Sequence, residues 1–228
     1  MCQSSPRNRY RKYPEKTALL YPQYYGSVAY YALMGACGHA VVGTGELFDK
    51  RMKSVHRCEA ADTNGALRLT LPIAKPHGIP QARWTDVRLS THGAWWHVHR
   101  VTFESAYGRT PFFEYYIDRF MPFLGPEVVD DFPTIADLDI AIDTELRRIL
   151  LLETQVTYGT FPLGGCDGSA AGFTDASAIP PASAYEPYYQ VRGARHGFVP
   201  GMSVLDLIFN LGPEAPLYLS RMISGISL

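Results

Sequence analysis

Apolar residues recur at helical spacing along several parts of the chain. The clearest stripe starts at Ile135 and returns every three or four residues, which predicts an amphipathic helix over residues 135–152. Gly108 and Pro111 close another such segment, which predicts a helix over residues 94–107. The same reasoning predicts helices over residues 24–37 and 204–211, and one from residue 112 that is interrupted at Pro122.

Short apolar runs between these helices predict strands. Asn64-Gly65 precedes the alternating run 66–73, and Asn-Gly before such a run is a hairpin signal. Shorter strands are predicted at residues 17–21, 41–42 and 87–89. Helices and strands that mix along 228 residues are typical of one domain. We therefore expect an α+β or α/β fold, a single domain with a small mixed sheet packed against several helices.

Two segments lack the pattern of a packed element. Residues 1–16 carry five Lys and Arg side chains and few apolar ones, which predicts a flexible basic tail. Residues 164–187 are rich in Gly, Ala, Ser and Pro, which predicts a loop insertion. The folded domain is therefore expected to span residues 17–228.

The predicted C-terminal helix has a start signal, a stop signal and two faces. Ser203 is placed to cap it, and the spacing from Ser203 to Asp206 matches that of a capping box. Gly212 followed by Pro213 ends it. Asp206 and Asn210 are expected to point to a different, more polar side than the core-facing stripe of Leu205, Ile208 and Phe209.

Charge, hydrophobic runs and cysteine content argue against several classes of protein. Lys plus Arg is 21 and Asp plus Glu is 22, so the net charge of −1 offers no general attraction for nucleic acid. No run approaches the roughly 20 apolar residues of a membrane span. The N-terminus carries no apolar signal segment, so a cytoplasmic location is expected. The four cysteines form no CxxC pair, and neither a metal site nor a cofactor is expected.

One histidine and one aspartate are candidate catalytic groups. A helix over residues 94–107 places Trp95 and His99 on one face, where histidine exchanges protons near neutral pH and tryptophan offers an apolar floor for a sugar or acyl chain. Asp206 is a candidate base, with Asn210 one turn away to hold a carbonyl or hydroxyl. A packed aromatic helix and a helix cap explain the same residues without chemistry, so both interpretations stay open.

Several short segments follow one another in a characteristic order between about residue 17 and about residue 225. They are Tyr21-Pro-Gln23, Phe48-Asp-Lys50, His56-Arg-Cys58, Asn64-Gly65, Leu71-Pro-Ile73, Asp86 to Ser90, Trp95, His99, Ser105-Ala-Tyr107, Pro111 to Tyr116, Pro187 to Gln190, Gly197 to Pro200 and Ser203 to Gly212. Together they resemble the WbqC-like family. The chain departs from the family pattern at His56, where the family has Asn, and in an extended segment at residues 164–186.

The resemblance implies a role in making surface polysaccharide, because this largely uncharacterised family is associated with O-antigen gene clusters. The expected activity is acyl or aminoacyl transfer, with an activated sugar or an acyl or aminoacyl donor as the partner molecule. His99 and Asp206 are the expected catalytic residues. The residues expected to bind the substrate are Tyr21, Trp95, Tyr189, Gln190 and Asn210.

In a second hypothesis, the protein binds a ligand or partner and catalyses no reaction. The chain has 15 Tyr and 11 Phe, more aromatic surface than any catalytic motif explains. Such surface suits a non-catalytic factor that binds a glycan or assembles with another protein. A pocket with clustered ionisable groups favours the enzyme, and a shallow aromatic groove without them favours the binding factor.

Overall fold

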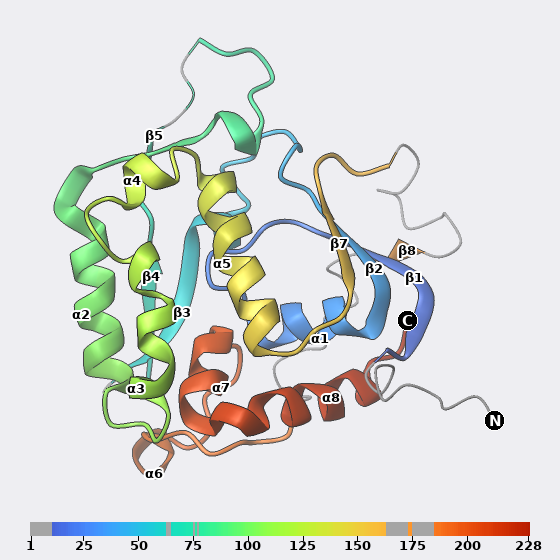
Figure 1. Ribbon diagram of the computed structural model, residues 1–228, viewed down its shortest axis with the longest axis vertical. Helices are drawn as coiled ribbons and strands as arrows, with labels where there is room; N and C mark the ends of the chain where they lie inside the picture. The colour runs from blue at the N-terminus through green and yellow to red at the C-terminus, as the bar shows by residue number, and fades with distance from the viewer. Residues whose placement is uncertain (1–10, 63–64, 75, 77, 163–172, 175–184) are drawn as a thin grey trace.

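A parallel sheet forms one side of the molecule. The computed structural model describes residues 11–62, 65–74, 76, 78–162, 173–174 and 185–228. The sheet has the strand order β7-β2-β1-β8, and each neighbouring pair is parallel (Figure 1). Its strands are β1 (Tyr13–Leu20), β2 (Cys37–Val42), β7 (Gln155–Tyr158) and β8 (Phe173–Thr174).

Helix α1 (Val28–Ala36) connects β1 to β2, and all of its residues are buried. Ser27 caps it, because its Oγ accepts a hydrogen bond from the backbone N–H of Tyr30 at 3.2 Å. The two strands then approach closely at Gly38. A Cβ atom on Gly38 would lie 1.9 Å from the carbonyl oxygen of Pro14, so only glycine fits at this point.

Two antiparallel ladders lie apart from the parallel sheet. β3 (Arg57–Asp62) pairs with β4 (Gly65–Thr70), which confirms the predicted hairpin, although its turn residues 63–64 lie outside the described residues. β5 (Ile73–Ala74) pairs with β6 (Arg88–Leu89). The α+β prediction is therefore confirmed, and the expected mixed sheet consists of separate parallel and antiparallel parts.

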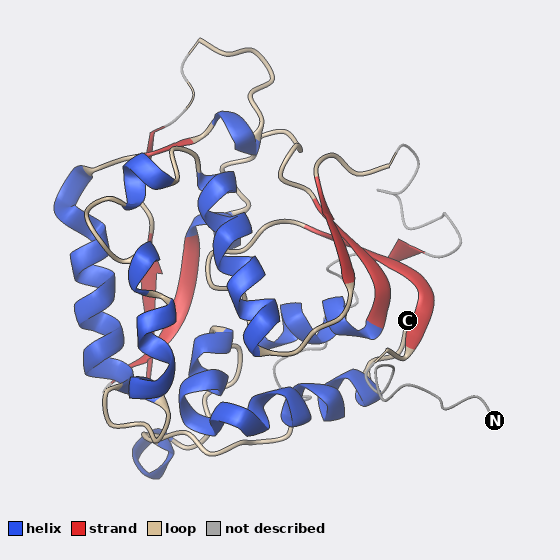
Figure 2. Ribbon diagram, in the orientation of Figure 1, coloured by secondary structure: helices blue, strands red, loops and turns tan. Residues whose placement is uncertain are grey.

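Helices fill the space between these strands (Figure 2). α2 (Trp95–Tyr107) packs against β3, and α5 (Ile135–Ile149) lies between the β3–β4 ladder and the parallel sheet in Figure 1. Shorter helices are α3 (Phe113–Tyr116), α4 (Val128–Asp131) and α6 (Gly193–His196). Turns of 3₁₀ helix lie at Lys53–His56, Trp84–Asp86, His92–Ala94, Ile117–Arg119, Met121–Phe123 and Gly212–Glu214.

The chain ends in two helices, α7 (Val204–Leu211) and α8 (Ala215–Gly225). The first was predicted with these bounds, and its core-facing stripe is fully buried. Phe209 packs against the rings of Tyr107, Phe113 and Phe120 from α2 and the chain that follows it. α8 was not predicted, because Gly212-Pro213 indicates only a stop. Proline also suits a first helical turn, and Pro216 takes that place in α8.

Several predicted boundaries are wrong for identifiable reasons. The helix predicted over residues 24–37 starts at Val28, because Tyr25 has a left-handed backbone with φ of 43°. The helix predicted to Leu152 ends at Ile149, because Leu151 has φ of 54°. β1 begins at Tyr13, inside the segment expected to be a tail, and pairs with β2 there. Residues 173–174 of the expected loop form β8, and most of the rest lies outside the described residues.

Candidate functional site

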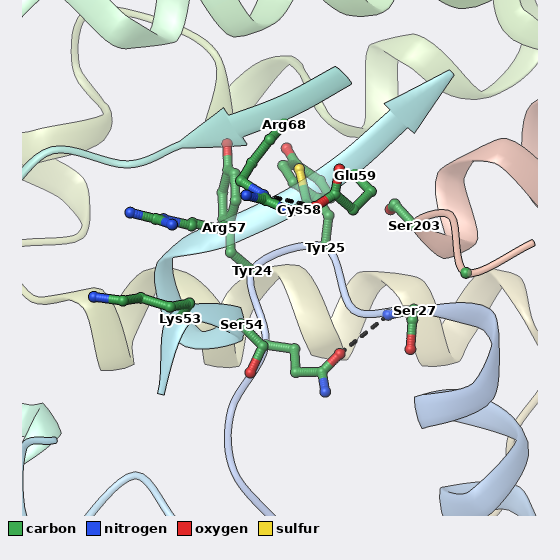
Figure 3. Close-up of a pocket in the computed structure, with 12 residues that line it drawn as sticks. Tyr24, Tyr25, Ser27, Lys53, Ser54, Arg57, Cys58, Glu59, Arg68 and Ser203 are labelled. Atoms are coloured by element: carbon green, nitrogen blue, oxygen red, sulfur yellow. Dashed lines mark hydrogen bonds and ion pairs between the residues drawn. The ribbon is translucent and has the colours of Figure 1, made fainter. Parts of the chain in front are cut away.

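A cleft opens beside the carboxyl end of β1. Its volume is about 390 Å³, within the range of about 300–1,000 Å³ that is typical of small-molecule sites. The loop after β1, the Lys53–His56 turn and the β3–β4 ladder form its walls (Figure 3). Its polar lining includes Gln23, Ser27, Lys53, Arg57, Glu59 and Arg68.

The first connection of the parallel sheet supplies one wall of the cleft. The chain leaves β1 at Leu20 and crosses to the β3–β4 ladder before α1 begins at Val28. Four residues of this connection line the cleft, namely Gln23, Tyr24, Tyr25 and Ser27.

Two helix N-termini meet at the cleft. Ser27 caps α1 and Ser203 caps α7, and both serines line the cavity. The two ends are held together, since the N–H of Val204 donates to the carbonyl of Gly26 at 2.9 Å. The positive ends of both helix dipoles therefore add to the electrostatic field in the cleft.

Charged side chains make the cleft cationic. Lys53, Arg57 and Arg68 supply three positive charges, and Glu59 supplies the one carboxylate among the lining residues. Nε of Arg68 donates to Oε1 of Glu59 at 2.7 Å, so those two charges compensate each other. Nε of Arg57 is buried and has no hydrogen-bond partner within the described part of the chain. Lys53 and Arg57 are thus available to an anion.

Three of the predicted site residues meet elsewhere, in a closed hydrogen-bond network on α7. Oδ2 of Asp206 accepts from the hydroxyl of Tyr188 at 2.5 Å and from Nε2 of Gln190 at 2.8 Å. Nδ2 of Asn210 donates to the Asp206 carbonyl at 2.8 Å. Asp206 is 1% exposed and Asn210 is 3% exposed. The side of α7 predicted to be more polar is therefore enclosed by protein.

The same geometry corrects the predicted capping box. Oγ of Ser203 accepts from the N–H of Leu205 at 3.2 Å, so the predicted cap is confirmed. The Asp206 carboxylate does not complete a box, because it is turned toward Tyr188 and Gln190. Burial raises the pKa of Asp206 from 3.8 to about 6, opposed by its hydrogen bonds, the strongest of them from Tyr188 and Gln190.

His99 and Trp95 form a separate pair on α2. Nδ1 of His99 lies 2.9 Å from the hydroxyl of Tyr24, and its ring packs 5.3 Å from the Trp95 ring. Burial lowers the pKa of His99 to about 4, so the imidazole is neutral at pH 7. Tyr24 lines the cleft but is 0% exposed. His99 therefore lies behind the cleft wall, one hydrogen bond away from it.

The remaining predicted residues lie in other places. The Tyr21 ring packs 5.2 Å from that of Phe161, and Tyr189 is 60% exposed. The predicted site residues do not converge on one cavity, and none of them lines the cleft. Their roles in catalysis and binding remain predictions.

The sequence analysis missed the cationic residues of the cleft, because the hairpin signal does not give the observed register. A two-residue turn at Asn64-Gly65 would pair Glu59 with Thr70, whereas the ladder pairs Glu59 with Arg68 and includes Gly65. Alternation along β3 then places Arg57 on the same face as Glu59. Lys53 lies in the preceding turn, and nothing in the sequence pattern brings it to this face.

A pair of buried carboxylates lies on α5. Asp143 accepts from Nε of Arg147 at 2.8 Å and from the Tyr158 hydroxyl at 2.5 Å. Asp139 is 2% exposed, and both of its oxygens lack a hydrogen-bond partner among the described residues. Over that part of the chain, no group of three or more His, Cys, Asp and Glu side chains is placed to hold a metal ion.

Fold and site together define an α+β protein with a cationic cleft between the loop after β1 and the antiparallel β3–β4 ladder. The chain belongs to the WbqC-like protein family, whose pattern matches residues 21–161. The matched range contains all of the cleft's charged residues, whereas Gln190, Asp206 and Asn210 lie beyond it. No curated protein and no solved structure matches the chain. None of the helices described is long and apolar enough to cross a membrane.

Proposed function

We propose that this WbqC-like protein is an enzyme of surface-polysaccharide biosynthesis whose cleft binds a phosphate-activated substrate. The observation that carries the proposal is the cleft itself, where Lys53 and Arg57 have no carboxylate partner among the described residues and lie beside two helix N-termini. Guanidinium and ammonium groups form strong charge-assisted hydrogen bonds with phosphate. The association of the family with surface-polysaccharide genes supports an activated sugar, or an acyl or aminoacyl donor, as the molecule that brings the phosphate.

The proposed reaction is transfer of an acyl or aminoacyl group. Such a transfer requires a base that takes a proton from the attacking hydroxyl or amine. His99 is the candidate for this role, with a neutral imidazole at pH 7 that its lowered pKa of about 4 makes a weak base. Its hydrogen bond to Tyr24 links it to the cleft wall. The Tyr24 hydroxyl would have to become accessible for a proton to pass between His99 and a bound substrate.

Calorimetric titration with pyrophosphate tests the proposed binding site. Arg57→Gln is expected to weaken binding at least tenfold, because it removes a charge and a buried donor from the cleft. Arg88→Gln is the matched control, since Arg88 is exposed on β6 and lies outside the cleft lining, and it should leave the affinity unchanged. Equal affinity in the wild type and Arg57→Gln, or no binding by the wild type, would reject the cleft as the phosphate site.

A transfer assay separates the enzyme from the binding factor. Wild-type protein is incubated with an activated sugar and an acyl or aminoacyl donor, and mass spectrometry detects the modified sugar. Modified sugar that disappears in Arg57→Gln supports the enzyme. Tight phosphate binding without any transfer, across a panel of donors, would favour the non-catalytic alternative.

A further inference from the structure

The cleft has two chemically different ends. Figure 3 shows the side chains of Lys53 and Arg57 extending to one side, with Ser27, Glu59 and Ser203 at the other. Arg57 and Glu59 are two residues apart on β3, so they share a face of the strand and are offset along it by about 7 Å. A ligand that fills the cleft therefore meets cations at one end and a carboxylate with hydroxyls at the other.

The hydroxyl end retains both donors and acceptors. Oγ of Ser27 and Oγ of Ser203 each accept one backbone N–H as helix caps, which leaves each O–H able to donate. Oε1 of Gln23 accepts from the N–H of Ser27 at 3.1 Å, and its Nε2 donates to none of the residues that the structure describes. Oε1 of Glu59 is bonded to Arg68, whereas Oε2 takes no hydrogen bond within the same residues.

This combination matches a group that carries several hydroxyls. Each sugar hydroxyl both donates and accepts, so it needs acceptors such as Glu59 Oε2 together with donors such as Ser27 and Gln23. A nucleotide base would instead need an exposed aromatic face for stacking. The two aromatic residues in the lining, Tyr24 and Tyr25, are 0% and 1% exposed and offer none.

We infer that the cleft binds a sugar phosphate, with its phosphate at Lys53 and Arg57 and its ring hydroxyls at Glu59, Gln23 and Ser27. The inference rests on the proposed function, because it assigns the substrate of the same cleft. It adds that the sugar itself is recognised by protein groups, and that these groups lie opposite the phosphate.

Calorimetry with four probes tests the assignment, using glucose 1-phosphate, inorganic phosphate, pyrophosphate and uridine diphosphate. The wild type is expected to bind glucose 1-phosphate at least tenfold more tightly than inorganic phosphate. Glu59→Gln should reduce this ratio below threefold. Gln23→Leu is a second variant that removes an amide donor without freeing Arg68, and it should also reduce the ratio. Arg57→Gln should weaken both phosphate compounds and keep their ratio.

The outcomes separate this inference from the proposed function. If the wild type binds both phosphates equally, and Arg57→Gln weakens both, the sugar assignment is wrong while the phosphate site stands. If uridine diphosphate binds more tightly than pyrophosphate, which has the same number of phosphates, the sugar assignment is also wrong, because a nucleoside would then be the group recognised. If no phosphate compound binds to the wild type, the proposed function fails with it.

Discussion

Two polar regions lie next to each other at the start of α7, and they differ in how their hydrogen bonds are used. Ser203 and Asp206 are three residues apart on the chain. Ser203 lines the cleft, where Arg57 Nε has no partner among the described residues. Asp206 is 1% exposed and accepts from Tyr188 and Gln190. One region is open and incompletely bonded, and the other is closed and bonded.

The difference shows which polar residues can serve a ligand. The Asp206 network ties the segment at residues 188–191 to α7, since Asn210 Oδ1 also accepts from the N–H of Val191 at 2.9 Å. A network of this kind stabilises one arrangement of the chain. The cleft holds charges and donors that have no partner within the described part of the chain, so they can serve a ligand. We therefore assign a structural role to Asp206 and ligand binding to the cleft. The following substitutions test these two assignments.

The largest effect is expected from Asp206→Ala. The change leaves the Tyr188 hydroxyl and Gln190 Nε2 without their acceptor, and it should lower the free energy of unfolding by about 4 kcal/mol at pH 7. Chemical denaturation measures the loss, with the exposed Asp118→Ala as control at under about 0.5 kcal/mol. A loss below about 1 kcal/mol would show that Asp206 is not a structural anchor, and would return it to consideration as a catalytic base.

The unfolding free energy lost in Asp206→Ala should also depend on pH, and this change should be slightly smaller than the loss itself. The pKa of Asp206 is raised from 3.8 to about 6 by burial, so between these values the folded state holds the proton and the unfolded state releases it. Stability from this group is complete below about pH 4 and is lost as pH rises through 6, which amounts to about 3 kcal/mol. The difference in unfolding free energy between wild type and Asp206→Ala should thus be larger at pH 4.5 than at pH 7.5. The opposite trend would mean that the folded protein prefers the ionised carboxylate.

A substitution of the unpaired buried carboxyl on α5 should have the opposite sign. Burial, and then the neighbouring Asp143, hold the pKa of Asp139 well above its usual range. Asp139→Leu removes an unpartnered polar group from the core and should raise the free energy of unfolding by about 2 kcal/mol at pH 7. Thermal melts with Asp118→Leu as the surface control measure this. A destabilised Asp139→Leu would contradict the absence of partners and show that the carboxyl is bonded in solution.

The smallest stability effect is expected from Ser203→Ala, and this change connects the two regions. Loss of the cap on α7 should cost about 1 kcal/mol in unfolding free energy. It should leave glucose 1-phosphate binding unchanged, because Ser203 is 2% exposed and lies behind the surface of the cleft. Thr134→Ala removes the corresponding cap of α5, away from the cleft, and should cost similar stability, also without a change in affinity. Weaker binding by Ser203→Ala than by Thr134→Ala would show that the Ser203 hydroxyl reaches the ligand.

The sequence predicted the helices and strands better than it predicted the candidate functional site. Ser203, Gly212 and the apolar stripe between them were sufficient for α7, because caps and periodicity act locally. The surroundings of Asp206 were not predictable, because Tyr188 and Gln190 reach it from a segment whose path depends on tertiary packing. The cleft was missed for a similar reason. It forms where separate turns and strands meet, and the strand order that brings them together has no local signature.

Side-chain amide signals give the most direct test of the division between cleft and network. Gln23 lines the cleft, whereas Gln190 and Asn210 belong to the closed network, and all three have NH₂ groups visible in ¹⁵N–¹H NMR spectra. Titration with glucose 1-phosphate should shift the Gln23 signal and the backbone amides of residues 53–59, and leave Gln190 and Asn210 unchanged. Shifts at Gln190 and Asn210 with none at Gln23 would place the ligand at the Asp206 network and contradict the account.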